Sequence, residues 1–339
     1  MPYTADSSLE AFVRQLPKTE THLHMEGACP YELLKAMDPV KYANPPAFWD
    51  DDFRYESFDQ FMDWYVDYCS TFFTSAKRYH DAAKIVLKNC VDQGCRYVET
   101  SFHLPVVLFM EDTGPAVLDA IRSAAPPGLE LRIFAGVCHN DYVDAGLELI
   151  EECLTWEGLD GLDLHGQEYI ALEPWTAEVW ARARQAGKFT KAHAGEFMGA
   201  DFIDLVLDEL KVTRIEHGVR SVENASTLQR LVDEGVALDV CPISNVKLAV
   251  EGVTSMAAHP IRKLFDAGVT VTINSDDPFF FGNRLSEEYY ALHQELGFSR
   301  AELARIAGNG FEVALVDEEM RQRFQGELAD YCSEQSLEN

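Results

Sequence analysis

The sequence predicts an α/β fold, specifically a (β/α)8 TIM barrel. Short apolar runs alternate with longer stretches of helical periodicity, which is typical of parallel strands joined by crossover helices. Eight such runs occur, and eight strand–helix units close this barrel. An open doubly wound sheet is the alternative, but no glycine-rich phosphate loop follows the first run. The runs lie at residues 21–25, 96–102, 131–137, 161–164, 189–193, 214–216, 237–240 and 270–274.

The chain of 339 residues is expected to form a single domain, residues 1–339, because barrels of this length are common. About seventy residues separate the first two runs, so we expect an insert at about residues 40–90. Its helical pattern predicts either a lid over the active-site face or an ordinary helix packed on the barrel. Residues from Ser299 onward predict C-terminal helices. One face of the insert's helix carries Phe58, Phe61, Met62 and Tyr65.

Acidic residues strongly outnumber basic ones. The chain has 57 Asp and Glu residues against 28 Lys and Arg, which gives a formal net charge of −29. Such a field repels phosphate backbones and anionic lipid headgroups, so neither a nucleic acid nor a membrane is expected as a partner. The expected ligand is a small molecule that is neutral or weakly charged. A salty native environment is a second explanation of the charge.

The eight cysteines favour a reducing compartment. None forms a Cys-x-x-Cys pair, and several lie in apolar runs, as buried thiols do more often than disulfides. The first ten residues lack the apolar core of a signal peptide, and no apolar run approaches the length of a membrane span. We therefore expect a cytoplasmic protein. The sequence leaves the oligomeric state open, a homo-oligomer included.

Four of the eight predicted strands end in residues that bind metals or titrate. His22 and His24 alternate in the first run, so both side chains would point to one face. A single His-x-His pair is usually incidental, but the carboxyl ends of barrel strands surround one opening, where barrel enzymes hold their catalytic groups. The coincidence therefore predicts a metal site. Its candidates are His22 and His24 at the first strand, His193 and Glu196 at the fifth, His217 at the sixth, and Asp276 and Asp277 at the eighth.

Five motifs in the chain match those of a known family. They are His22-x-His24-x-x-Gly27, His193-Ala-Gly-Glu196, His217-Gly218, CPISN at residues 241–245 and SDDP at residues 275–278. With these motifs in this order along the chain, the sequence resembles the adenosine deaminase family of the amidohydrolase superfamily. The resemblance covers about residues 16–289, and the aromatic helix at residues 57–65 resembles that family's lid. Each motif is weak alone, but the ordered set is specific.

The resemblance implies one zinc ion per chain. His22, His24, His193 and Asp276 would bind it, with one position left for water, as catalytic zinc requires. Zinc lowers the pKa of its water toward neutrality, which would supply hydroxide. His217 would orient that water and take its proton.

The resemblance also implies a hydrolytic deaminase of a 6-aminopurine. Glu196 would protonate N1 of the base so that water attacks C6 and ammonia leaves. Asp277 would share a hydrogen bond with N7, and the backbone N–H of Gly166 would meet N3, because glycine permits close approach. Glu26 and the aromatic face of the insert would line the substrate pocket.

Two markers of the substrate disagree. Family members that act on nucleosides usually carry Asp where this chain has Glu26, and Glu is frequent in members resembling adenine deaminases. Gly166 is of the nucleoside type, since adenine-specific relatives tend to have Ser-Ser-Glu there. We therefore rank adenosine or deoxyadenosine slightly ahead of adenine, with a modified adenosine-like metabolite also open. His165, where a small residue is more usual, and His103, at the end of the second strand, either reach the pocket or pack beside it.

Two other classes of function stay open at this point. A zinc amidohydrolase that cleaves a non-purine amide or ester would have no use for Glu196 as a donor to a ring nitrogen. A non-catalytic purine sensor would have no use for a complete ligand set. The fourth predicted strand carries no lysine, which argues against the carbamylated-lysine dinuclear centre of related amidohydrolases.

Overall fold

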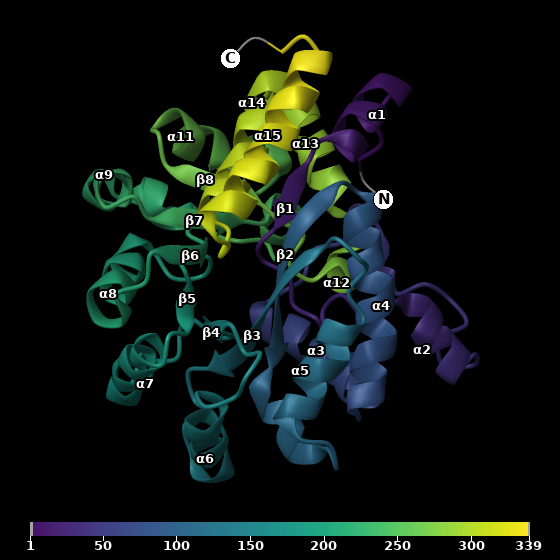
Figure 1. Ribbon diagram of the computed structural model, residues 1–339, viewed down its shortest axis with the longest axis vertical. Helices are drawn as coiled ribbons and strands as arrows, with labels where there is room; N and C mark the ends of the chain where they lie inside the picture. Colours follow the sequence, from purple (N-terminus) through teal and green to yellow (C-terminus); the bar gives the residue numbers. More distant parts are fainter. Residues whose placement is uncertain (1–2, 338–339) are drawn as a thin grey trace.

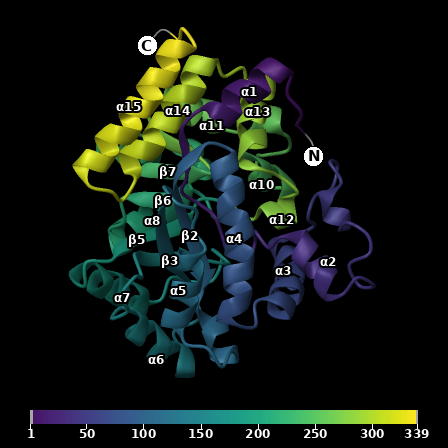
Figure 2. The ribbon, with the colours of Figure 1, turned by 45° about the vertical axis from the view of Figure 1, so that its right-hand side comes forward.

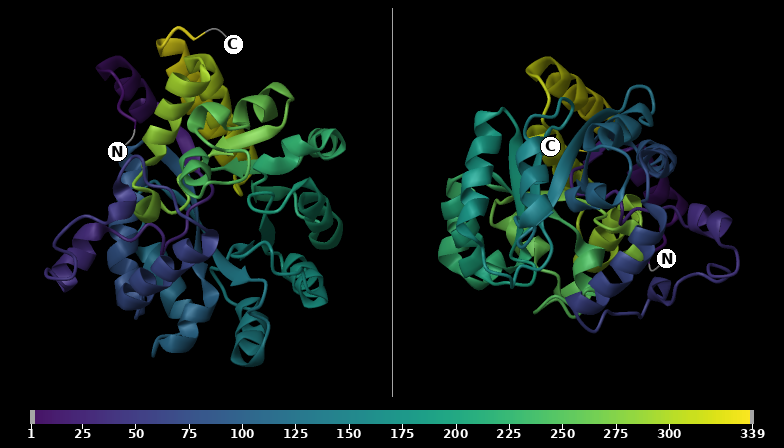
Figure 3. Two further views of the ribbon diagram at one scale, coloured as in Figure 1. Left: turned by 180° about the vertical axis from the view of Figure 1, so that it is seen from behind. Right: turned by 90° about the horizontal axis from the view of Figure 1, so that it is seen from below.

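The computed structural model describes residues 3–337, and within them eight parallel strands form one sheet in the order β1 to β8. Helices surround the strands, so the predicted TIM barrel is confirmed (Figures 1 and 3). Seven of the eight predicted strands agree with the structure to within a residue or two at each end. The strands are β1 (Lys18–Glu20), β2 (Cys95–His103), β3 (Glu130–Cys138), β4 (Gly161–His165), β5 (Phe189–Ala194), β6 (Arg214–His217), β7 (Ala237–Val240) and β8 (Thr270–Ile273).

The prediction for the first strand was wrong. The structure places β1 at Lys18–Glu20, whereas residues 21–25 form an extended segment beyond it. Leu23 forms an isolated bridge with Asp276, and His24 forms one with Ser101. These bridges hold the segment between β8 and β2, so the barrel closes there and the alternation of side chains continues past the end of the strand.

The outer ring consists of helices that each bury one apolar face. In α8, for example, Phe202, Ile203, Val206 and Leu207 are buried against the barrel while acidic residues face outward. The ring follows the strands in chain order, and Figure 1 shows α6 to α9 side by side along it. Its helices are α4 (Ala76–Asp92), α5 (Gly114–Ser123), α6 (Asp144–Cys153), α7 (Pro174–Gln185), α8 (Ala200–Leu210), α9 (Ala225–Asp233) and α11 (Ile261–Asp266).

The long insert before β2 contributes α2 (Tyr31–Met37), a 3-10 turn at Ala47–Trp49 and α3 (Phe58–Phe72). Ser57 caps α3 by accepting a hydrogen bond from the Gln60 N–H at 3.1 Å. In Figure 2, α3 is seen between α4 and α2, and α4 itself packs on α5 and β2. The part of the expected insert that reaches the active-site face is therefore α3.

The remaining helices close the ends of the barrel. Among them, α14 covers the amino-terminal ends of β1 and β8, where a Cβ on Gly310 would lie 2.0 Å from Thr19 Oγ1. Glycine at this position thus permits the close approach of helix and strand. Among the described residues, no helix combines the length and apolar character that crossing a bilayer requires. These helices are α1 (Ser7–Gln15), α10 (Pro242–Lys247), α12 (Pro278–Phe281), α13 (Leu285–Leu296), α14 (Arg300–Val313) and α15 (Glu318–Glu334).

Candidate active site

A cavity of about 390 Å3 opens at the carboxyl ends of the strands. Polar groups from the strand ends form its inner part, and α3 together with the segment after β2 covers its outer part. The inner lining comprises His24, Glu26, His103, Cys138, His165, Gly166, His193, Glu196, His217, Asp276 and Asp277. The outer lining includes Phe58, Phe61, Met62, Tyr65, Phe73, Val106 and Phe109. The structure thus brings nearly all of the sequence-predicted residues to one place.

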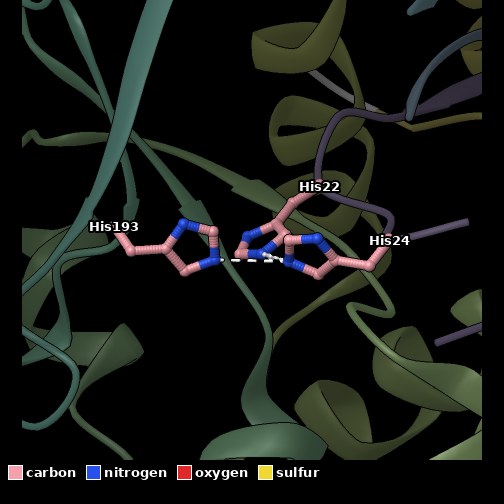
Figure 4. Close-up of side chains that lie close together, drawn as sticks. All are labelled: His22, His24 and His193. Atoms are coloured by element: carbon pink, nitrogen blue, oxygen red, sulfur yellow. Dashed lines mark hydrogen bonds between the residues drawn. The ribbon is translucent and has the colours of Figure 1, made fainter. Parts of the chain in front are cut away.

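Three histidine side chains converge in the inner part (Figure 4). His24 Nε2 lies 3.3 Å from both His22 Nε2 and His193 Nε2. The opposite ring nitrogens contact backbone carbonyls: His22 Nδ1 lies 3.2 Å from Asp239 O, and His193 Nδ1 lies 3.0 Å from Leu164 O. Because a carbonyl only accepts, both Nδ1 atoms donate, and the lone pairs of both Nε2 atoms point into the cluster.

Asp276 adds a carboxylate to these nitrogens. Its Oδ1 lies 3.3 Å from His22 Nε2 and 3.5 Å from His24 Nε2. Ser244 Oγ donates to its Oδ2 at 2.6 Å, which holds the carboxylate in place. The backbone φ is +63° at Asp276 and +65° at His217. This left-handed region costs free energy for a residue other than glycine, and residues that adopt it cluster at functional sites.

The donor set fits a tetrahedral metal ion. A zinc ion with Zn–N distances of about 2.0–2.1 Å spaces its ligand nitrogens about 3.3 Å apart. This is the separation found between the paired Nε2 atoms of the cluster. Two imidazole nitrogens whose lone pairs face the cluster, a third nitrogen at the same spacing and a carboxylate together form a donor set that a cation would complete.

A chain of hydrogen bonds fixes the neighbouring groups. The Ile261 N–H donates to His259 Nδ1 at 3.2 Å, so the neutral His259 ring carries its hydrogen on Nε2 and donates to Asn245 Oδ1 at 3.1 Å. The Asn245 amide group then donates to Glu196 Oε1 at 3.0 Å and to His217 Nδ1 at 3.1 Å. In the neutral His217 ring the hydrogen is therefore on Nε2.

Glu196 is prepared as an acid by its surroundings. Burial, with the negative charges of Asp276 and Glu168, raises the pKa of Glu196 well above its ordinary value. Because Oε1 accepts the Asn245 amide hydrogen, the proton belongs on Oε2, which lies 3.5 Å from His217 Nε2. Burial lowers the pKa of His217 well below its ordinary value, which keeps this ring neutral.

Glu168, in the loop after β4, holds the loop that carries Glu196. One of its oxygens accepts the Glu196 N–H at 3.0 Å, and the other accepts the N–H groups of Phe197 at 3.0 Å and Met198 at 2.6 Å. A carboxylate that accepts three backbone N–H groups ties the two loops together. Glu168 thus positions Glu196 without facing the cluster itself.

Asp277 lies against Gly27, which explains the glycine of the first motif. A Cβ on Gly27 would lie 1.6 Å from Asp277 Oδ1, so no larger residue fits there. That oxygen is buried and has no hydrogen-bond partner among the described residues. Burial, together with the charge of Asp276, raises the pKa of Asp277 well above its ordinary value. An unsatisfied buried oxygen lining a cavity is available for a ligand.

Glu26 is buried at the side of the cavity. Its Oε1 accepts hydrogen bonds from the Tyr79 hydroxyl and from the His103 N–H, the latter at 3.0 Å. Burial raises the pKa of Glu26 to about 7.

His103 and His165, whose placement the sequence left open, both line the cavity. His103 Nδ1 lies 3.1 Å from His165 Nε2. Gly166 follows with φ +88°, a conformation that suits glycine, and lines the same part of the cavity.

The aromatic face of α3 covers the cavity and packs on the loops beneath it. The Phe58 ring lies 4.6 Å from that of Phe197, next to Glu196, and the Phe61 ring stacks on Phe281 at 5.6 Å. The helix therefore both lines the cavity and packs on the loops of the barrel, and its role as a lid stays a prediction.

Sequence reasoning named the residues that face the cluster but gave no role to those behind them. Glu168, Asn245 and His259 have hydrogen-bond partners 14 to 49 residues away in the chain, which no local pattern reveals. Asn245 is the last residue of the CPISN motif at residues 241–245, and its amide side chain, which both donates and accepts hydrogen bonds, was the one indication of its role.

The chain is similar to known proteins along most of its length. The family model described as adenosine deaminase matches residues 17–331. A protein of Hahella chejuensis named adenine deaminase is 31% identical over 337 residues, covering 95% of this chain and 99% of its own. A protein of Sinorhizobium fredii with the same name is 33% identical and covers 91% of this chain and 97% of its own.

Solved structures share the fold. The crystal structure of an adenine deaminase from Arthrobacter aurescens superposes with a TM-score of 0.83 at 26% identity, covering 94% of this chain and 99% of that one. An amidohydrolase from Burkholderia ambifaria, with bound zinc, superposes with a TM-score of 0.82 at 21% identity, covering 99% of this chain and 96% of that one.

Proposed function

The chain belongs to the adenosine deaminase family, and from this premise we propose that it hydrolyses adenine to hypoxanthine and ammonia with one zinc ion bound. Membership makes it a metal-dependent hydrolytic deaminase of an adenine-like purine. The finer choice of adenine reverses the order that the sequence favoured, which put adenosine first. Full-length relatives named adenine deaminase support the reversal.

Glu26 is the observation that carries the choice of free base. Family members acting on nucleosides usually have the shorter Asp here, where it meets the sugar. The Glu26 carboxylate is 1% exposed and held by Tyr79 and the His103 N–H, so it does not swing away to admit a ribose. Adenine bears an N9–H that this carboxylate can accept, whereas in adenosine N9 carries the sugar instead.

His22, His24, His193 and Asp276 would hold the zinc ion. When bound there, zinc supplies Lewis-acid activation of water near neutral pH. His217 would donate from Nε2 to orient the attacking water, because the Asn245 amide already occupies its Nδ1. This orienting role replaces the expectation that His217 also takes the proton, since the nitrogen that faces the reaction carries a hydrogen in the neutral ring.

Glu196 would supply the proton to N1 of the purine. Protonation at N1 breaks the conjugation that resists attack and lets C6 become tetrahedral. The resulting Glu196 carboxylate would take the proton that the attacking water gives up. Protonated again, Glu196 would donate to the amino group as it leaves as ammonia and take the hydroxyl proton of the C6 adduct, so it ends as the acid it began as. Asp277, with its unsatisfied Oδ1, would share a hydrogen bond with N7, and the Gly166 N–H would meet N3.

The test compares kcat/KM for adenine, adenosine and deoxyadenosine on the zinc-loaded protein. Turnover is measured from the change in ultraviolet absorbance when the 6-aminopurine becomes a 6-oxopurine. We expect adenine to exceed both nucleosides by at least about 10²-fold, because sites that bind a substrate N–H reject analogues lacking it. Equal or faster turnover of a nucleoside would overturn the choice of adenine.

A matched pair of variants assigns that preference to Glu26. Glu26→Asp shortens the side chain by one methylene and should raise the ratio of nucleoside to base turnover by about tenfold or more. Glu32→Asp makes the same change at an exposed position of α2 and should leave the ratio unaltered. An unchanged ratio in Glu26→Asp would remove Glu26 from the explanation.

A further inference from the structure

Three adjacent strands end in a second cluster of metal-binding side chains. His103 ends β2, Cys138 ends β3 and His165 ends β4, and none of them belongs to the proposed zinc site. Their ligand atoms all lie within 4.8 Å of one another. All three residues line the cavity, so an ion could reach them.

The strand register builds this cluster. Cys138 pairs with His165 across β3 and β4, and His103 pairs with Gly136 across β2 and β3. A Cβ on Gly136 would lie 2.5 Å from His165 Cε1, so the absence of a side chain there lets the imidazole cross β3 toward His103. The His103 Nδ1 to His165 Nε2 separation of 3.1 Å is close to the about 3.3 Å between nitrogens on a tetrahedral zinc ion.

The charge around the cluster suits a cation. Asp141 accepts the Cys138 N–H on its Oδ2 at 2.6 Å, which places a carboxylate beside the thiol. A donor set of two imidazoles and one thiol selects borderline and soft divalent ions, zinc above all, over magnesium or calcium.

We propose that His103, Cys138 and His165 form a second zinc site whose occupation blocks the purine. A Cβ on Gly166 would lie 3.0 Å from Cys138 Sγ, so an ion on that sulfur lies beside the glycine that we assign to N3. The ion and the base therefore exclude one another. Only this competition rests on the proposed function, because binding of the second ion does not depend on the reaction.

The test counts zinc after equilibrium dialysis of protein that already holds one ion. We expect a second equivalent on the native protein and on Cys332→Ser, a control on α15 outside the cavity. In Cys138→Ser and His103→Ala we expect the affinity for the second equivalent to fall by at least about tenfold. One equivalent on the native protein at saturating free zinc, or a second that persists in both variants, would overturn the site.

Two further readouts separate the parts of the proposal. With Co2+ as the probe, the second equivalent should add a thiolate-to-cobalt charge-transfer band that is absent from Cys138→Ser. Free zinc should raise the KM for adenine on the native protein but not on Cys138→Ser. A second equivalent without any rise in KM would keep the metal site and overturn the competition. If the protein does not turn over adenine at all, the number of zinc ions bound per chain still shows whether the second site exists.

Discussion

The barrel strands carry buried polar and charged residues both deep in the barrel and at its mouth. The two sets differ in whether their hydrogen-bonding groups find partners within the protein. In the deep network, Arg214 donates to Glu99 Oε1 at 2.9 Å and to Asp239 Oδ2 at 3.1 Å. Thr21 and Thr272 donate to the remaining Asp239 oxygen at 2.9 and 2.7 Å. Each charge of this network has a partner within the protein, as a structural network requires.

At the mouth, by contrast, the polar groups are not all satisfied within the protein. His24 Nε2 lies 3.3 Å from the Nε2 atoms of both His22 and His193, and Asp277 Oδ1 has no partner among the described residues. Two non-glycine residues of the mouth, His217 and Asp276, also adopt left-handed backbone. The difference shows that buried polar side chains alone do not indicate function. A cluster of incompletely partnered groups around one cavity does, because a ligand can complete them.

The largest effect is expected from removing a metal ligand. His193→Ala deletes one of three converging nitrogens, so bound zinc should fall from one ion per chain to nearly none, and deamination with it. Metal analysis after gel filtration provides the measurement. His80→Ala, on α4 and outside the cavity, is the control and should keep the ion. Stoichiometric zinc in His193→Ala would contradict the ligand assignment.

Glu196→Gln should separate chemistry from metal binding. The amide keeps the shape of the side chain but has no acidic proton, so kcat should fall by about 10²–10⁴-fold with zinc retained. Single-turnover kinetics on the zinc-loaded variant would measure this. A rate within threefold of the native value would exclude Glu196 as the proton donor.

The deep network is expected to respond in stability instead. Arg214→Met removes the cation that the buried carboxylates of Glu99 and Asp239 share and leaves Glu99 with Lys191 Nζ, 3.7 Å away, which should lower the free energy of unfolding by about 3–5 kcal/mol. Denaturant unfolding would show this loss, while the folded fraction should still bind one zinc ion. Arg323→Met removes an exposed cation and should change stability little. If Arg214→Met lost its zinc while its free energy of unfolding stayed at the native value, the division between a structural and a functional network would be contradicted.

The smallest effect concerns the lid. Phe58→Ala removes the ring that packs on Phe197, an aromatic contact of about 0.5–1.5 kcal/mol. If the contact favours the closed lid over the substrate, the KM for adenine should rise about two- to tenfold with little change in kcat. Steady-state kinetics would test this, and an unaltered KM would assign α3 to packing alone.

The sequence predicted the barrel and the residues of the cluster but not all of their setting. β1 was placed three residues too late because Lys18, Thr19 and Glu20 are polar yet buried, with Lys18 Nζ donating to the Val13 and Leu16 carbonyls at 2.6 and 2.9 Å. Such a strand has no apolar signature. His22 and His24 were nevertheless placed correctly on one face, because the extended segment keeps the alternation.

The groups behind the cluster depend on contacts that only the folded chain creates. Glu168, Asn245 and His259 act through hydrogen bonds to other strand ends, and their residue types are common in loops. The roles of His103 and His165 depended on Gly136, whose missing side chain lets the two rings meet. Neither kind of relation follows from spacing along the chain.

The most direct test of metal-dependent adenine deamination at the mouth is ammonia release from adenine before and after removal of the metal. Protein stripped by a chelator should release none, and addition of one zinc equivalent should restore release in a one-to-one ratio with hypoxanthine. Ammonia release that persists undiminished in the stripped protein, or zinc-loaded protein that leaves adenine unchanged, would contradict it.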